Sequence, residues 1–235
     1  MKVEIVEAGH KIETPLEWLL MYPELIEKWG RKCYKSEHLI KPGSAKPFIK
    51  RIIKSKHLSV IEHLTITVTI ICSRSCSHQL VRHRIGSYSQ ESQRYVNYKK
   101  KGYQIICPKE ITEINAEKLW KIPGAPFSNI MDFYENIFEK PWMETVEKTL
   151  YQYEDLISQG IKPEIARSVL PNCMKTEIVS TFNLSQWRHI FEERALNKRA
   201  QFEIRQLMQG ILKHFNLFLP EFFVDQVKKL EEIEK

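Results

Sequence analysis

One segment of the chain concentrates the side chains that could do chemistry. From Gln79 to Tyr95 the sequence reads QLVRHRIGSYSQESQRY, with three arginines, one histidine, three serines and two tyrosines in 17 residues. The planar guanidinium of arginine can bind a phosphate through two parallel hydrogen bonds, and serine hydroxyls and loop N–H groups add further donors. The segment therefore predicts a site for an anionic, phosphorylated ligand.

A strand and a helix are expected to position this segment. Residues 64–72 (LTITVTIIC) are rich in β-branched side chains and predict a strand. Ser73 is a suitable N-cap for a helix over residues 74–84, and Gly86 predicts the exit from that helix into a polar loop. The side chains of this helix that we expect to face the core are Cys76, Leu80 and Val81.

The remaining patterns predict one α+β domain over residues 1–235, with a central antiparallel-type sheet and more helix than strand. Further strands are expected over 3–6 and 176–182. Residues 102–130 contain several prolines and predict an irregular excursion. Helical patterns cover residues 15–26 (split by Pro23), 47–54, 129–158 (kinked near Pro141), 163–170, 185–194 and 198–215, followed by an amphipathic tail.

The charge balance favours anionic partners. The chain has 36 Lys and Arg against 29 Asp and Glu, a net charge of +7. Nucleic acid and phosphorylated small molecules both fit this charge, so a basic nucleic-acid-binding module is the main alternative function. The scarcity of lysine between residues 79 and 95 favours the small molecule, and the lysine run 99–101 lies outside that segment.

Composition also bears on compartment and metal content. No apolar run approaches the ~20 residues of a membrane helix, and the first residues lack the apolar segment of a signal peptide, so we expect a cytoplasmic protein. Five cysteines, an odd number, argue against a disulfide framework. Cys72 and Cys76, followed by His78 and His83, leave a zinc site as a weaker alternative, but no second ligand pair appears and we expect no metal.

The anion segment is one of several ordered motifs. Arg82-His83-Arg84, then seven residues, then Ser92 form an RHR-x7-S pattern. Residues 59–63 (SVIEH) precede it, and residues 166–171 (ARSVLP) follow it. The series continues with Asn183, His189, Arg194 and residues 200–205 (AQFEIR). Together these motifs resemble those of the flavin-dependent thymidylate synthases, and four ordered elements are far more specific than RHR alone.

The resemblance implies an enzyme that methylates dUMP to dTMP. It implies FAD as hydride carrier, 5,10-methylenetetrahydrofolate as carbon donor and NADPH as reductant. It also implies a homotetramer with active sites at subunit interfaces, with neither nucleic acid nor membrane as partner. No GxGxxG motif follows a strand here, so flavin binding is implied by the family's signature alone.

Carried over residue by residue, the resemblance implies two ligand sets. The FAD set is Ser59, Arg82, His83, Arg84, Gln90, Asn183, Ser185 and His189. The dUMP set is Gln79, Arg82, Gln90, Glu91, Ser92, Gln93, Arg94, Arg167 and Arg194. Arg194 is the expected catalytic residue, because a cation beside uracil N3 stabilises the negative charge that makes C5 nucleophilic. Ser92 and Arg94 are expected to hold the phosphate, with Ser92 as a ligand and not a nucleophile.

Three positions depart from the family pattern. Ser185 stands where many members carry an arginine near the flavin, which weakens the expected contact there. Gln90 stands where some members have glutamate, and both side chains can accept a hydrogen bond. Lys198 stands where some members have histidine.

Overall fold

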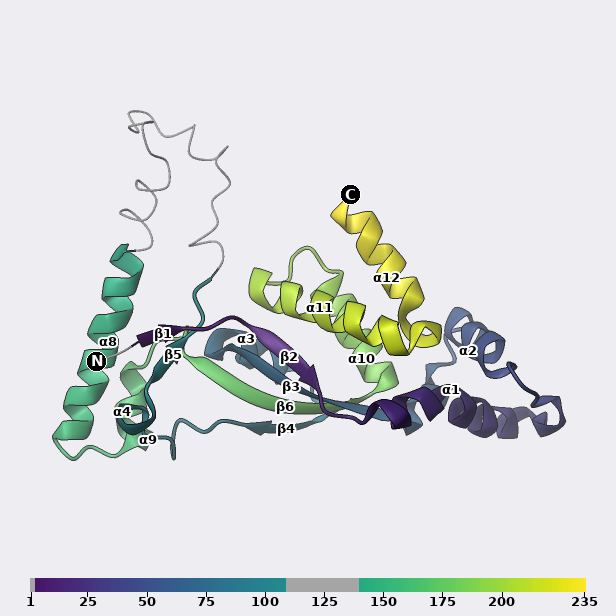
Figure 1. Cartoon of the computed structure of the whole chain (residues 1–235), viewed down its shortest axis with the longest axis horizontal. Helices are drawn as coiled ribbons and strands as arrows, with labels where there is room; N and C mark the ends of the chain where they lie inside the picture. The colour runs from purple at the N-terminus through teal and green to yellow at the C-terminus, as the bar shows by residue number, and fades with distance from the viewer. Residues whose placement is uncertain (1–2, 109–139) are drawn as a thin grey trace. The chain divides into compact units, whose positions relative to one another are not determined.

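The computed structural model describes residues 3–108 and 140–235, which form two compact units (Figure 1). The first unit comprises residues up to Ala8, Ile71–Ser77 and Gln90–Thr176, and the second comprises Gly9–Ile70, His78–Ser89 and Glu177–Lys235. Each unit thus combines segments that are far apart in the sequence. The grouping of residues 1–235 into one domain stays a prediction.

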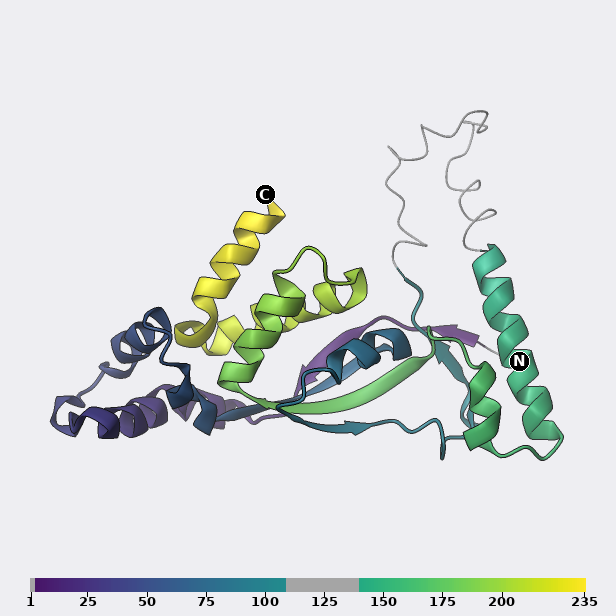
Figure 2. The ribbon, with the colours of Figure 1, turned by 180° about the vertical axis from the view of Figure 1, so that it is seen from behind.

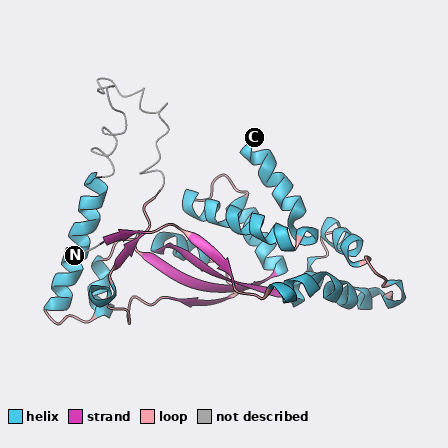
Figure 3. Ribbon diagram, in the orientation of Figure 1, coloured by secondary structure: helices cyan, strands magenta, loops and turns pink. Residues whose placement is uncertain are grey.

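The larger sheet has four strands in the order β2-β3-β6-β4 (Figure 3). The strands are β2 (Gly9–Ile12), β3 (Thr65–Ser73), β6 (Lys175–Asn183) and β4 (Ser87–Gln90). Alternate side chains of β3, from Ile66 to Cys72, are fully buried, as are Ile178 and Ser180 of β6. The two long strands predicted from β-branched runs are therefore confirmed. The prediction of a polar loop after Gly86 was wrong for β4, whose alternating Ser, Tyr, Ser and Gln give no hydrophobic repeat.

Helices of the second unit begin with α1 (Leu16–Gly30), η1 (Arg31–Tyr34), η2 (Glu37–Leu39), α2 (Ala45–Lys54) and η3 (Leu58–His63). They continue with α10 (Leu184–Ile190), the π-helix η6 (Phe191–Ala195), α11 (Phe202–Phe218) and α12 (Pro220–Glu234). In both Figure 1 and Figure 2, α10, α11 and α12 lie on the same side of the larger sheet. Trp187 is fully buried there, between the rings of Phe182, Phe191 and Phe215.

The helix predictions at Pro23 and over residues 74–84 were wrong. Pro23 does not split the first helix, because α1 runs unbroken through it. An internal proline costs a helix ~3 kcal/mol, and the burial of Leu19, Tyr22 and Ile26 on the same helix offsets this. The helix expected over 74–84 is α3 (Arg74–Leu80), which ends four residues early.

The early end of α3 follows from its last hydrogen bonds. Arg82 N donates to Gln79 O at 3.4 Å and His83 N donates to Leu80 O at 3.1 Å, so the chain tightens into i→i+3 turns. Val81 is consequently 36% exposed and not in the core as predicted. The predicted cap is confirmed, since Ser73 Oγ accepts from Cys76 N at 3.0 Å.

The first unit has a parallel pair of strands, β1 (Val3–Ile5) and β5 (Tyr103–Ile105). Its helices are α4 (Tyr98–Lys101), α8 (Lys140–Ser158), α9 (Pro163–Ala166) and η5 (Arg167–Val169). The prediction of an irregular excursion over 102–130 was wrong for residues 103–105, which form β5. The rest of that prediction from residue 109 on, and the predicted helical stretch 129–139, lie outside the described residues. The core of this unit is built from Tyr98, Tyr103, Ile105, Val146, Leu150, Tyr153, Ala166 and Met174.

These elements confirm the predicted α+β class. Within residues 3–108 and 140–235, no helix is both long and apolar enough to cross a membrane.

Candidate functional site

In the second unit, the predicted catalytic arginine contacts the central histidine of the RHR motif. Arg194 Nε donates to His83 Nε2 at 3.2 Å, although 111 residues separate them in sequence. The His83 ring also meets the ring of His189 edge-on, with centroids 5.9 Å apart. Three predicted site residues from two distant segments therefore form one cluster.

The environment of His83 keeps its imidazole neutral. The side chain is only 7% exposed, and burial, with the positive charge of Arg194 and the nearby His189, lowers its pKa from 6.5 to about 4. Because Nε2 accepts from Arg194, we assign the ring proton to Nδ1. A neutral partner orients the Arg194 guanidinium without cancelling its charge. Glu192, two residues before Arg194, pairs with Lys229 at 3.0 Å.

A π-helical turn presents Arg194. In η6 the N–H of Leu196 donates to Phe191 O at 3.0 Å, an i→i+5 bond. Such turns shift side chains relative to an α-helix and occur frequently at functional sites. The sequence predicts an ordinary helix over residues 185–194, and this prediction was wrong for the turn because no residue type specifies it.

Tyr88 and Gly86 shape the RHR turn. The Tyr88 hydroxyl lies 2.8 Å from Leu80 O and 2.7 Å from His83 O, and burial raises its pKa to about 12. A Cβ at Gly86 would overlap the ring of Phe182, so only glycine fits this close approach. Gly86 was expected to end the helix. Its structural role is instead to let the loop pass over Phe182.

The other predicted residues of the second unit are distributed around this cluster. Asn183 Oδ1 caps α10 by accepting from Gln186 N at 2.7 Å, and Ser185 follows in its first turn. Gln79 donates to Gln201 on the 200–205 motif. The predicted FAD ligands with exposed side chains are Ser59, Arg82, Arg84 and His189.

In the first unit, hydrogen bonds fix Gln90 and Glu91. Gln90 Nε2 donates to Ser77 Oγ at 2.9 Å and to Thr176 Oγ1 at 3.2 Å. The Glu91 carboxylate accepts from the Tyr98 hydroxyl at 3.0 Å and lies 3.5 Å from Lys175 Nζ. Arg74 donates to Glu91 O at 3.2 Å. Gln90 and Glu91 were predicted from the sequence, whereas Ser77, Thr176, Tyr98 and Arg74, which hold them, were not.

Two arginines of the predicted dUMP set, Arg94 and Arg167, meet at Glu164 in this unit. Arg94 lies 3.8 Å from the Glu164 carboxylate, and Arg167 Nε donates to Glu164 O at 3.2 Å. Ser92 Oγ accepts from Arg94 N at 3.3 Å, and Gln93 lies between them in the chain. A hydroxyl and two guanidinium groups from two motifs far apart in the sequence thus gather in the first unit. The spacing of Glu164 and Arg167 on one helical turn was the available signal for Glu164.

The cysteines of the zinc alternative lie in the interior. Cys72 and Cys76 are both fully buried. Among the residues that the structure describes, no three His, Cys, Asp or Glu side chains are grouped so that they could hold a metal ion.

Comparison with known proteins decides the family. The family model described as thymidylate synthase complementing protein matches residues 19–221. The chain belongs to this family. The flavin-dependent thymidylate synthase of Pyrococcus furiosus is 36% identical over 202 residues, which cover 86% of this chain and 74% of that protein. That of Mycobacteroides abscessus is 34% identical over 207 residues, 86% of this chain and 79% of its own.

A solved structure supports the fold of this family member. The UMP/dUMP methylase PolB from Streptomyces cacaoi, bound with 5-Br UMP, superposes with a TM-score of 0.73 over 95% of each chain. Since the identity is 19%, this likeness speaks for the fold alone. Membership in the thymidylate synthase complementing protein family confirms the family predicted from the ordered motifs. The ligand roles of single residues stay predictions.

Proposed function

We propose that this protein is a flavin-dependent thymidylate synthase that converts dUMP to dTMP. The observation that carries the proposal is its 36% identity, over 86% of the chain, to a protein of that name. The proposed carbon donor is 5,10-methylenetetrahydrofolate and the proposed reductant is NADPH. The transferred methylene must gain two electrons to become a methyl group. Because NADPH supplies them, the folate leaves as tetrahydrofolate.

The exposed arginines of the second unit fit an FAD site. Arg82 and Arg84 have no acidic partner among the described residues, so both guanidinium groups are available to a pyrophosphate. Asn183 Oδ1 is occupied by the cap of α10, which leaves its NH₂ group to donate to a ligand. Ser185 offers a hydroxyl where many relatives offer an arginine. Bound FAD would supply hydride transfer from NADPH to the transferred carbon.

Arg194 is the group that we propose to activate the uracil ring. Negative charge develops on N3 and the neighbouring oxygen as C5 becomes nucleophilic, and a fixed cation lowers the energy of that state. The bond to His83 uses only Nε of the guanidinium, and Nη1 and Nη2 have no acceptor among the described residues. The bond to neutral His83 therefore orients the Arg194 side chain, leaves its Nη1 and Nη2 groups available to the uracil ring, and does not offset its positive charge.

Ser92, Arg94 and Arg167 are proposed to bind the phosphate of dUMP. The Arg94–Glu164 pair is exposed and 3.8 Å long, so it contributes little and a phosphate dianion can replace it. Gln90 and Glu91, fixed by Ser77, Thr176 and Tyr98, would contact the nucleoside. Gln79, Arg82 and Gln93 complete the proposed dUMP set.

We also propose a cytoplasmic homotetramer with active sites at subunit interfaces. Helix α1 supports this assembly, because Trp18, Leu20 and Met21 are 60%, 58% and 56% exposed on it. Exposed apolar side chains gathered on one helix are typical of surfaces that become buried on association. Light scattering of the purified protein would test the tetramer directly.

An absorption spectrum of the purified protein, before and after dUMP, tests the proposed function. We expect flavin bands near ~450 nm that change on adding dUMP, and dTMP formed only when dUMP, folate and reductant are all present. A protein that carries no flavin, and binds none when FAD is added, would contradict the proposal. The nucleic-acid alternative would then have to be tested.

A further inference from the structure

The positive charge of the chain is concentrated in one segment. Residues 28–56 contain ten Lys and Arg and a single acid, Glu37, which is a net charge of +9. Since the whole chain carries +7, the other 206 residues together carry −2. This segment forms the end of α1, η1, η2 and α2 in the second unit, and none of its residues belongs to the FAD and dUMP sets above.

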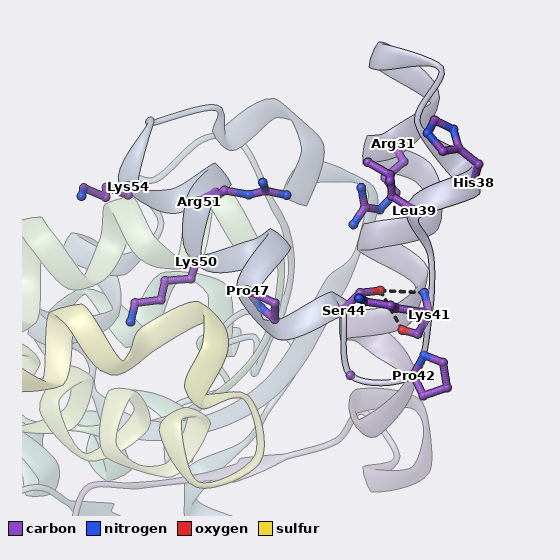
Figure 4. A pocket seen from close by; sticks show the side chains of 11 residues that line it. Arg31, His38, Leu39, Lys41, Pro42, Ser44, Pro47, Lys50, Arg51 and Lys54 are labelled. Atoms are coloured by element: carbon purple, nitrogen blue, oxygen red, sulfur yellow. Dashed lines mark hydrogen bonds between the residues drawn. The ribbon is translucent and has the colours of Figure 1, made fainter.

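A pocket opens in this basic segment (Figure 4). Its volume is about 850 Å³, within the usual range for ligand sites of about 300–1,000 Å³. Leu39, Pro42 and Pro47 provide apolar lining, and no Asp or Glu lines the pocket. The basic side chains that line it are Arg31, His38, Lys41, Lys50, Arg51 and Lys54.

Of the five Lys and Arg side chains that line the pocket, one is held by a buried carboxylate and four are free to bind a ligand. Arg31 is buried and bound to Glu27, with Nε–Oε1 at 2.7 Å and Nη2–Oε1 at 2.6 Å. Ser44 also donates to Glu27, at 2.7 Å. By contrast Lys41, Lys50, Arg51 and Lys54 are exposed and have no acidic partner among the described residues.

Helix α2 holds three of these cations at a cost. Lys50 and Lys54 are four residues apart, a spacing at which like charges destabilise a helix by a few tenths of a kcal/mol. Arg51 lies between them in sequence, with its guanidinium 6.0 Å from the centre of the Phe48 ring. Lys46, on the same helix, is paired with Glu221 at 2.8 Å. Figure 4 shows the Arg51 side chain extending toward Arg31, whereas Lys50 and Lys54 point to the other side of α2. An anion in the pocket would therefore be held chiefly by Arg51 and Lys41.

We propose that this pocket binds the 2′-phosphate end of the nicotinamide reductant and so selects NADPH over NADH. The inference rests on the proposed function, which requires this reductant while the sequence offers no Rossmann motif for it. A phosphate monoester carries nearly two negative charges and three acceptor oxygens near neutral pH, which suits a cluster of Lys and Arg better than single carboxylates do.

The position of the pocket fits a reductant of the flavin. Helices α1 and α2 both pack against η3, and η3 carries Ser59, a proposed FAD ligand. The pocket and Ser59 therefore belong to the same packed group of helices within the second unit.

The test is a calorimetric titration of the full-length protein with adenosine 2′,5′-bisphosphate and with adenosine 5′-diphosphate. We expect the wild type to prefer the 2′-phosphate. Lys41→Gln and Arg51→Gln should each weaken binding of the bisphosphate about tenfold, the effect of losing one charge-assisted hydrogen bond. Lys32→Gln is the matched control, because Lys32 is exposed in the same basic segment but does not line the pocket. The affinity of Lys32→Gln for the bisphosphate should change less than about twofold.

Turnover supplies the second readout. Arg51→Gln should raise KM for NADPH about tenfold with kcat and the KM for NADH unchanged. The proposed 2′-phosphate site would be overturned if Lys32→Gln lost as much affinity as the pocket variants. It would also be overturned if the wild type showed no preference for the 2′-phosphate, or if an oligoglutamate peptide competed equally well. Binding is measured without turnover, so the two proposals can fail separately. If the protein bound the 2′-phosphate but formed no dTMP, the proposed function would be rejected and the proposed 2′-phosphate site would stand.

Discussion

Acid should destabilise this protein through His83. Its pKa in the folded state is about 4, against 6.5 when it is unperturbed, so between these values the unfolded state binds more protons. The stability that neutral His83 contributes is therefore complete above pH 6.5 and is lost as the pH falls toward 4. His83→Gln removes the titrating group and keeps a side-chain oxygen that can accept from Arg194.

The two pKa values set the size of the effect. At pH 5 an unperturbed imidazole is almost fully protonated, whereas His83 with a pKa of about 4 is mostly neutral. The linkage relation then gives a loss of about 2 kcal/mol between pH 7 and pH 5. That is a large fraction of the ~5–15 kcal/mol by which domains are stable.

Urea unfolding followed by tryptophan fluorescence, at pH 7 and pH 5, measures this loss. The wild type should lose about 2 kcal/mol more between the two pH values than His83→Gln does. The control is His78→Gln, which removes an exposed histidine of α3 and should lose as much as the wild type. If wild type and His83→Gln had the same pH dependence, the burial of a neutral His83 against Arg194 would be refuted.

Three substitutions test the rest of the site. Arg194→Ala should keep the fold and bound flavin but lower kcat roughly 10²–10³-fold, and turnover like that of the wild type would exclude the activating role. Ser92→Ala should weaken dUMP binding about tenfold and retain some activity, whereas complete loss of turnover with unchanged affinity would indicate a chemical role. Gly86→Ala should cost about 1–3 kcal/mol in urea unfolding, because its Cβ meets the Phe182 ring, and an unchanged midpoint would contradict that close packing.

Strands and helices were predictable where one strong pattern dominates. In β3 and β6 the β-branched side chains favour strand, and alternate positions lie in the core. The edge strand β4 lacks any hydrophobic repeat, and its pairing is a property of its neighbour, so its own residues could not reveal it. The unbroken α1 shows the converse, because burial along the helix outweighs the local preference of Pro23.

The site was predictable in its residue types but not in its contacts. The ordered motifs named His83 and Arg194, yet nothing in their spacing indicates that Arg194 donates to a neutral imidazole. Arg194 lies in the π-helix η6, whose i→i+5 bond is not specified by any residue type. The contacts of Glu164 were likewise not predictable, because its carboxylate meets Arg94, which is 70 residues away in the sequence.

The location of the net charge changes what that charge means. A total of +7 favours nucleic acid only if the cations are spread over an extended face that can follow a phosphate backbone. Here residues 28–56 hold more than the whole surplus of positive charge, and five of their Lys and Arg side chains line a pocket of about 850 Å³. The segment from Gln79 to Tyr95 has three arginines and one glutamate, a net charge of only +2. The composition that suggested nucleic acid is therefore better explained by one local site for a small, highly charged anion.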